Sequence, residues 1–377
     1  MEYFMALYLG LTAWFFILLG LGLRKDSIYL AEIWPRLPED KKLRRDQLTV
    51  LVLVLVSFVL LWFLTAFRSS EIGNDTKNYL ISFGILRNSF SDKFLAEYGY
   101  QLLNIIINQF THDKHAFLII MAMIMYVGLG LYIYKFSRNP AVSLCIFFGC
   151  FFSSYLCIFR QGIAMIIVLY GYELLKRGKK IPAALLFLLA TTFHTTALVA
   201  FLLFLDLKIF GKRWFVFSLA ALCAIVSRLG VFETLVDMIV PRYTHYFHSK
   251  YASSGWLAIT YYILLYAVIY YLISASLIEE ERSDRTVAAN FTFLLFFTAF
   301  GYAVNLFDRV GEYFLLIGVT EIPNMLYRGK VKHFRLWLFG VCAVMLIMFV
   351  LILIYRPGWN HMYPYEFWPD SIFAAWN

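Results

Sequence analysis

The chain has 377 residues, of which 62% are hydrophobic and 15% are charged, with a formal net charge of +9 and a mean hydropathy of +0.71. Soluble domains are closer to half apolar and a quarter charged, so this composition excludes a water-soluble globule. The basic residues are spread over short breaks between apolar runs, which excludes a nucleic-acid partner. All five cysteines lie inside apolar runs, without the spacing of a metal site or a disulfide framework. We expect an all-α polytopic membrane protein with no metal and no cofactor.

Charged breaks divide the sequence into about twelve apolar segments, which we take as membrane-spanning helices of a single transmembrane domain, 1–377. The segments are 3–23, 48–67, 116–134, 141–158, 161–175, 181–194, 196–210, 214–227, 256–277, 287–304, 310–326 and 336–355. The largest polar stretches between them are 68–115 and 228–255, which we expect to be two loops on the same face of the membrane.

The orientation follows from the basic residues. If successive loops alternate sides, one face receives 22 of the 33 Lys and Arg residues, and the face with loops 68–115 and 228–255 receives 11. The positive-inside rule places the first face in the cytoplasm, so both loops and both termini are predicted outside.

The first polar loop, 68–115, is predicted to contain two amphipathic helices. Asp75 or Thr76 can cap the first helix, and a second helix spans about 98–110. One face of the first helix is apolar: Tyr79, Leu80, Phe83, Leu86 and Phe90. The second has a polar stripe and an apolar stripe: Gln101, Asn104 and Asn108 against Leu102, Ile105 and Ile106. Such helices lie along a membrane surface or fold back over a cavity mouth.

The segment 181–210 has two possible structures. It is either a short hairpin with its tip at 192–196 or one long helix across 181–205, which would invert every later loop. Each leg of the hairpin is shorter than the bilayer core. We prefer the hairpin, because it keeps the basic residues after it in the cytoplasm. Its tip, which contains His194, would then lie below the outer surface, where irregular backbone must be buried in protein or line a wet cavity.

Arginines on the outer face are the first candidates for chemistry, because orientation selects against them. Arg160 and Arg309 each precede an apolar helix, where the helix dipole disfavours a lone cation and favours a bound anion. The alternative is interfacial snorkelling or a structural ion pair, with Asp308 as a partner for Arg309. Arg68 ends an outward-running helix, and Arg242 lies among aromatic residues. For these two, ligand binding and a plain structural role are equally supported.

Acid–base chemistry needs a proton acceptor near the outer face. His194 at the hairpin tip is one candidate, against the alternative of a satisfied core histidine. Among the outer carboxylates we select Asp75, although a helix cap explains that residue as well. The other outer carboxylates considered are Glu97, Asp308 and Glu312. The run 279–285 is expected to be a solvated cytoplasmic loop.

Four segments resemble the EpsG family of exopolysaccharide proteins, relatives of Wzy-type polymerases. Residues 68–79 contain its R…G-x-D-x-x-x-Y pattern, and residues 97–100 its E-x-G-[YF] pattern. Residues 159–164 resemble its R-Q-x-[IL]-A helix start, and Phe193-His194 resembles its F-H turn. Residues 308–323 resemble its late R-x-x-x-Y…I-P pattern.

The resemblance implies a glycosyltransferase that joins undecaprenyl-diphosphate-linked oligosaccharide repeat units at the outer face of the bacterial cytoplasmic membrane. It implies a lipid-sugar (GT-C-like) architecture, and a flippase and a chain-length regulator as pathway partners. The residues that match the family patterns are Arg68, Asp75, Tyr79, Arg160, Gln161, His194, Arg309 and Tyr313. We expect Arg160, Arg309, His194 and Asp75 to be catalytic, and Arg68, Tyr79, Gln161, Arg242 and Tyr313 to bind substrate. Two other functions fit the sequence: a transporter of lipid-linked oligosaccharides, and a membrane O-acyltransferase.

Overall fold

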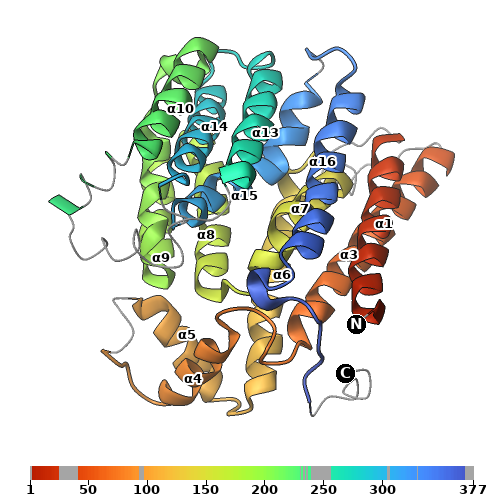
Figure 1. Ribbon diagram of the computed structural model, residues 1–377, viewed down its shortest axis with the longest axis vertical. Coiled ribbons are helices and arrows are strands. Elements are labelled where there is room, and N and C mark those ends of the chain that lie inside the picture. Colours follow the sequence, from red (N-terminus) through yellow and green to blue (C-terminus); the bar gives the residue numbers. More distant parts are fainter. Residues whose placement is uncertain are drawn as a thin grey trace. The chain divides into compact units, whose positions relative to one another are not determined.

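The computed structural model describes residues 2–24, 41–92, 97–229, 231, 234, 237–238, 256–303, 306–328 and 330–369. The regular secondary structure of these residues is helical throughout (Figure 1). One isolated antiparallel bridge joins Arg68 to Phe367. The chain forms two compact units. The first comprises Met1–Ile167, Leu188–Thr195 and His333–Asn377, and the second Val168–Phe187 and Thr196–Lys332.

The first unit contains four helices that are long and apolar enough to span a membrane, together with shorter elements. Its helices are α1 (Glu2–Arg24), α3 (Lys41–Ala66), α4 (Thr76–Ile85), α5 (Tyr98–Asn108), α6 (Lys114–Phe136), α7 (Pro140–Tyr155), α16 (Phe334–Tyr355) and the 3-10 turn η4 (Trp359–His361). Helices α8 (Phe159–Lys176) and α9 (Lys180–Phe193) contribute residues to both units. The four candidate spans that lie in this unit are α1, α3, α6 and α16.

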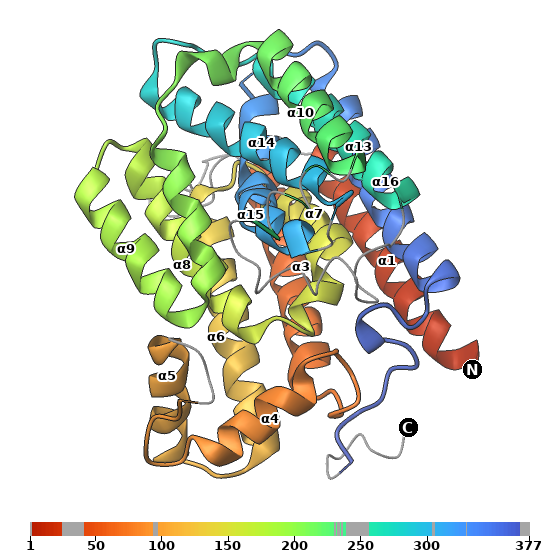
Figure 2. The same ribbon diagram turned by 60° about the vertical axis from the view of Figure 1, so that its left-hand side comes forward.

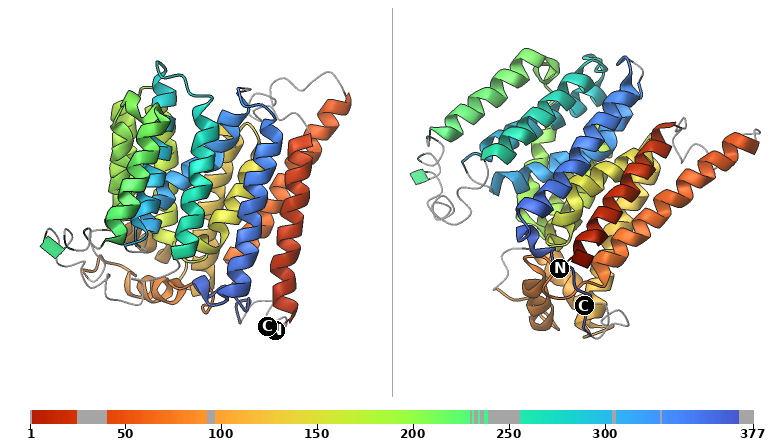
Figure 3. Two further views of the ribbon diagram at one scale, coloured as in Figure 1. Left: turned by 45° about the horizontal axis from the view of Figure 1, so that its top comes forward. Right: turned by 45° about the vertical axis from the view of Figure 1, so that its right-hand side comes forward.

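Caps and aromatic packing fix the helices of the first unit. Asp113 begins α6 by accepting a hydrogen bond from the Ala116 amide, 2.8 Å away, as an N-cap carboxylate does. Helices α1, α7 and α16 pack together (Figure 3). At their contact the rings of Phe15 and Phe148 stack with centroids 4.2 Å apart. Burial of such rings supplies most of the packing energy.

The segment after α16 folds back onto the residues that follow α3. The Ser69 amide donates to the carbonyl of Glu366 at 2.8 Å, and the Trp368 amide donates to the carbonyl of Phe67 at 2.8 Å. The Tyr8 hydroxyl near the start of α1 donates to the carbonyl of Met362 at 2.5 Å. The start of α1, the 68–115 loop and the C-terminal segment therefore share one end of this unit, as the predicted topology requires. The side of the membrane on which this end lies stays a prediction.

The second unit is built around α14 (Arg282–Phe300). Helices α10 (Arg213–Arg228), α13 (Trp256–Ser274) and α15 (Leu306–Leu326) pack against it (Figure 2). Its other elements are the 3-10 helices η1 (Thr195–Phe204), of which Thr195 belongs to the first unit, and η2 (Lys208–Gly211). Phe297 of α14 stacks on Phe314 of α15 with centroids 5.5 Å apart. The predicted loop 228–255, with Arg242, lies almost entirely outside the described residues.

All twelve predicted apolar segments coincide with helical structure, and the protein is a polytopic helical membrane protein. Five helices are long and apolar enough to cross a bilayer: α1, α3, α6, α13 and α16. The count of twelve crossings and the lipid-sugar glycosyltransferase architecture stay predictions.

The hairpin predicted for 181–210 is confirmed. The ring of Phe187 in α9 lies 5.6 Å from that of Phe201 and 5.8 Å from that of Phe204 in η1. In one continuous helix, residues fourteen apart would be separated by about 21 Å. The second leg is a 3-10 helix rather than an α-helix.

The two helices predicted in the 68–115 loop are present, with one correction. Phe90 does not share the buried face of α4, because α4 ends at Ile85 and Phe90 is exposed. In α5 the polar stripe of Gln101, Asn104 and Asn108 is the buried one, whereas Leu102 and Ile106 are exposed. The Asn108 side-chain amide satisfies backbone carbonyls of Phe83 and Leu86, 3.0 and 3.1 Å away, so the inward polar face holds α4 in place.

Candidate functional site

A single carboxylate holds together two of the residues predicted to be catalytic. Glu97 Oε2 accepts a hydrogen bond from Arg160 Nη1 at 2.5 Å, and Glu97 Oε1 lies 2.7 Å from His194 Nδ1. The carboxylate is 1% exposed, whereas the Arg160 and His194 side chains are 31% and 22% exposed. All three belong to the first unit. The two basic side chains therefore keep an accessible side, and the carboxylate between them does not.

Three helix ends bring these side chains together. Glu97 is the N-cap residue of α5, Arg160 lies in the first turn of α8, and His194 follows the last residue of α9. Gly99 permits the approach of α5 to the hairpin tip, because a Cβ atom there would lie 2.3 Å from Thr192 Oγ1. The glycine of the E-x-G-Y segment is thus explained by close packing.

Two tyrosine rings line Arg160. Its guanidinium carbon lies 5.8 Å from the ring centroid of Tyr79 and 5.7 Å from that of Tyr100. Both tyrosines are buried, and burial raises the pKa of Tyr79 to about 12, so its hydroxyl stays neutral. The two rings orient the guanidinium group through cation–π contact and packing, and they add no second negative charge.

The charge on Glu97 fixes the tautomer of His194. Burial alone would raise the pKa of Glu97, but the hydrogen bond from His194 and the charge of Arg160 outweigh it and hold the pKa below its usual value. Glu97 is therefore ionised at neutral pH and acts only as an acceptor. The His194 Nδ1–H donates to it, so Nε2 is the ring nitrogen that does not face Glu97.

Arg68 has a different environment from the one expected of a substrate-binding residue. It is fully buried, and its guanidinium donates to the backbone carbonyls of Thr65 and Leu156 and to the hydroxyl of Thr76. Burial lowers the pKa of Arg68 to about 10, so it is charged at neutral pH. Arg68 joins the end of α3 to the turn before α8, which favours a positioning role for it.

Gly73 serves the same junction. It has a φ of +87°, and a Cβ atom there would lie 2.3 Å from the carbonyl oxygen of Leu156.

Asp75 is the N-cap residue of α4 and is half-buried, but its side chain makes no capping hydrogen bond. The alternative of a plain helix cap for Asp75 is therefore not supported, and its catalytic role stays a prediction.

The remaining predicted site residues are divided between the two units. Gln161 is buried beside Arg160 in α8. Tyr313 of α15 is buried in the second unit, where its hydroxyl lies 3.2 Å from Thr196 Oγ1. Arg309 is exposed in the first turn of α15, and Asp308 has no described side chain. The pairing of Arg309 with Arg160 stays a prediction.

The central carboxylate is not one of the residues that the sequence predicts to be catalytic. Glu97 is one of four outer carboxylates in the sequence, and the prediction is Asp75. The signal that identifies Glu97 is the combination of a helix N-cap carboxylate with a glycine two residues later, which permits a close helix contact. No sequence pattern shows that the partner in this contact is the turn with His194.

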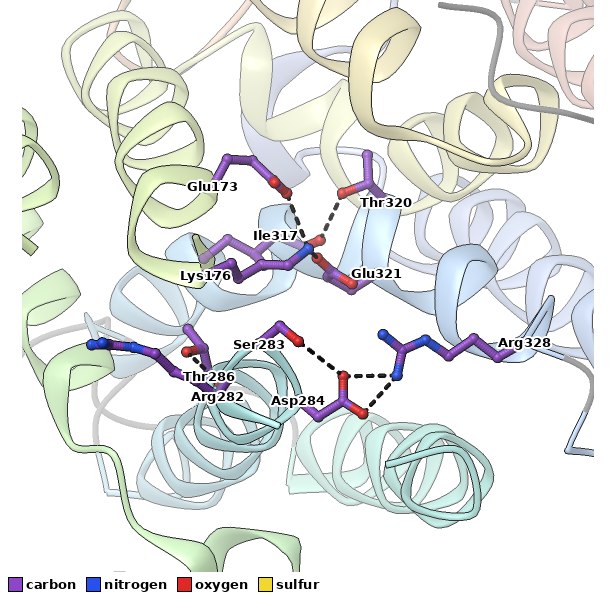
Figure 4. A network of polar contacts seen from close by, with 10 residues as sticks. All are labelled: Glu173, Lys176, Arg282, Ser283, Asp284, Thr286, Ile317, Thr320, Glu321 and Arg328. Atoms are coloured by element: carbon purple, nitrogen blue, oxygen red, sulfur yellow. Dashed lines mark hydrogen bonds and ion pairs between the residues drawn. The ribbon is translucent and has the colours of Figure 1, made fainter. Parts of the chain in front are cut away.

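A second charged cluster lies in the second unit (Figure 4). Lys176 at the end of α8 pairs with Glu173, 3.2 Å away, and with Glu321 of α15. Arg328 donates to both oxygens of Asp284, at 2.7 and 2.6 Å. Asp284 is 1% exposed, so this part of the predicted solvated loop 279–285 is instead buried and paired.

No group of His, Cys, Asp and Glu residues suited to a metal ion occurs among the described residues. Comparison with curated proteins returns no match, and neither does comparison with solved structures. The EpsG family model matches residues 51–367, a range that includes Glu97, Arg160, His194 and the segment after α16. The chain belongs to the EpsG family.

Proposed function

We propose that this protein is a polysaccharide polymerase that joins undecaprenyl-diphosphate-linked oligosaccharide repeat units at the outer face of the bacterial cytoplasmic membrane. Family membership supports a polymerase-like function. The observation that carries the proposal further is the cluster of Glu97, Arg160 and His194. It combines a base with an anion-binding group in one place, as a reaction that expels a diphosphate requires.

The reaction joins an acceptor sugar hydroxyl to the anomeric carbon of the donor. The oxygen of the acceptor hydroxyl forms the new bond, and the bond from the anomeric carbon to the diphosphate oxygen breaks with its electron pair on the diphosphate. His194 Nε2 takes the proton of the acceptor hydroxyl. Glu97 holds the ring in the correct tautomer and stabilises the imidazolium that forms.

Arg160 stabilises the leaving group. One side of its guanidinium is neutralised by Glu97, and the other is partly exposed. The first turn of α8 adds backbone N–H groups and the positive end of a helix dipole. Charge develops on the diphosphate as the glycosidic bond breaks, so these donors bind the transition state more strongly than the substrate. Arg309 is the proposed second cation, and a flippase and a chain-length regulator are the proposed pathway partners.

The purified protein in liposomes provides the test. A defined lipid-diphosphate repeat unit should yield longer lipid-linked oligosaccharides and an equal amount of released polyprenyl diphosphate. Deleting the gene should leave single lipid-linked units exposed on the outer leaflet. Transfer of units between leaflets without joining would identify a transporter instead. Normal polymer with altered acylation would identify the acyltransferase.

A further inference from the structure

Helix α5 turns its apolar side away from the protein. Its exposed residues recur every four positions, at Tyr98, Leu102 and Ile106, and Phe110 follows at the same spacing. We call these four residues the α5 stripe. They are 58%, 48%, 46% and 84% exposed, respectively. In water, α5 would have its apolar side in the solvent and its polar side in the core.

The polar side of α5 is used inside the protein. Gln101 Oε1 accepts from the Ser91 amide at 2.8 Å, and the Asn104 side-chain amide donates to the carbonyl of Tyr100 at 2.8 Å. Asn108 holds the end of α4, as described above. The bonds of Gln101 and Asn108 reach residues outside α5 and so fix its rotation about its axis, because turning the apolar stripe inward would break them.

We propose that the α5 stripe lies in the lipid bilayer, in the leaflet at this end of the first unit, and that it sets the depth of Glu97. The stripe continues towards α6, a candidate membrane span that begins four residues after Phe110. Outward-facing residues of that span have the same character and exposure, with Val127 at 48% and Leu131 at 58%.

A second copy of the chain is a poorer occupant than lipid. Helix α5 has 11 residues and is about 16 Å long, and one side of a helix is about 10 Å wide. The stripe therefore offers about 160 Å², far below the area of about 800 Å² per partner in a stable interface.

Basic residues near the stripe favour lipid. Arg87 after α4 and Lys114 at the start of α6 are exposed and can extend to lipid phosphates, as basic residues at a membrane surface do.

The consequence for the site rests on the proposed function. Glu97 immediately precedes the stripe, so immersion of α5 places the Glu97, Arg160 and His194 cluster at the level of the lipid headgroups. A lipid-linked sugar carries its diphosphate at that depth. The substrate could then reach Arg160 by lateral diffusion, without leaving the membrane.

Nitroxide labels can measure the depth of α5. Single cysteines replace Leu102, Ile106 and, as an exposed polar control on α4, Lys77, in a background without the five native cysteines. The labelled proteins are placed in liposomes of phosphatidylethanolamine and phosphatidylglycerol. Collisions with oxygen, which concentrates in lipid, are compared with collisions with a water-soluble nickel chelate. We expect the oxygen-to-nickel ratio at Leu102 and Ile106 to exceed that at Lys77 at least fivefold.

Equal ratios at all three positions would show a water-exposed helix and overturn the proposal. Shielding of Leu102 and Ile106 from both reagents would show a protein partner and also overturn it. If the Leu102→Cys variant does not fold, Phe110→Cys carries the label at the same stripe. The measurement is repeated with Glu97→Gln, which should leave the depth unchanged. If α5 has the expected depth but the native protein joins no repeat units, the proposed function fails and this inference stands.

Discussion

The two charged clusters of this protein have opposite compositions. Near the start of α8, the carboxylate of Glu97 is shared by Arg160 and His194, and both basic side chains are partly exposed. Near the end of α8, the ammonium of Lys176 is shared by Glu173 and Glu321, and both carboxylates are nearly inaccessible. Both clusters contain an ion pair between residues far apart in sequence. The two clusters therefore do not differ in whether they link distant helices.

The difference lies in which charge is in excess and which group reaches solvent. The Glu97 cluster can offer donors to an incoming anion, because its anion is enclosed and its basic groups are not fully used. The Lys176 cluster has an excess of negative charge and a cation with two partners, so it has little capacity to bind a diphosphate. We expect substitutions in the first cluster to change activity and substitutions in the second to change stability.

Lys176→Met should have the largest effect on stability. It leaves Glu173 and Glu321 buried beside each other without a cation, and removing one partner of a buried ion pair costs about 3–5 kcal/mol. Thermal unfolding in detergent, followed by size-exclusion profiles, measures this loss. The protein that remains folded should polymerise at close to the normal rate. A stable Lys176→Met protein with lost activity would contradict the comparison.

Arg160→Lys should cause the largest loss of activity at unchanged stability. Lysine keeps the charge but lacks the planar fork that binds a phosphate with two hydrogen bonds. Losing a donor that acts mainly in the transition state costs about 100-fold to 1,000-fold in rate. Polymer ladders and folded yield are measured on the same preparations, with Arg335→Ala as a control that should be nearly silent. Full activity of the lysine variant would show that Arg160 is only an interfacial cation.

Gly99→Ala should have a smaller effect on the same cluster. The added methyl group meets Thr192 Oγ1, so the first turn of α5 must move away from the hairpin tip and weaken the contact between Glu97 and His194. We expect about a tenfold loss of rate, since a small displacement of a catalytic group is costly. Gly84→Ala on α4, where nothing lies within 4 Å, is the matched control. Addition of Thr192→Ala should recover part of the activity.

The smallest expected effect is a pH dependence of stability. The pKa of Glu97 is lowered in the folded protein from an ordinary value of 4.5, so its contribution is present above about pH 4.5. It is lost as the pH falls through the folded pKa. Below pH 4.5 the unfolding temperature of the native protein should therefore fall more steeply than that of Glu97→Gln. Parallel curves for the two proteins would show that Glu97 is not ionised in this cluster.

Hydropathy was sufficient to predict where the helices lie, because twelve apolar runs separated by charges leave few alternatives in a membrane protein. It also predicted the break at His194, since two short legs and the basic residues after them fit a hairpin better than one helix. The charge pattern identified Arg160 and His194, because a cation at a helix N-terminus and a polar turn inside apolar sequence are both unusual.

The remaining features depend on contacts that a sequence pattern does not contain. Periodicity showed that α5 has a polar stripe and an apolar stripe, but it could not show that the polar stripe faces inward, because that depends on carbonyls of α4 that need donors. The burial of Arg68 depends on the carbonyl of Leu156, 88 residues away. The sequence favours Asp75 over Glu97 because no pattern in it shows that α5 lies against the hairpin tip.

The most direct test of the account is the rate of repeat-unit joining by the Glu97→Gln variant, measured against Glu71→Gln. Glu71 pairs with Lys77 on the surface, where both side chains are more than half exposed, so its replacement should be silent. The amide at position 97 keeps the shape of the side chain but loses the charge that orients His194 and Arg160. We predict a loss of about 100-fold or more for Glu97→Gln, with a normal size-exclusion profile. Equal rates for the two variants would contradict the assignment of this cluster as the catalytic site.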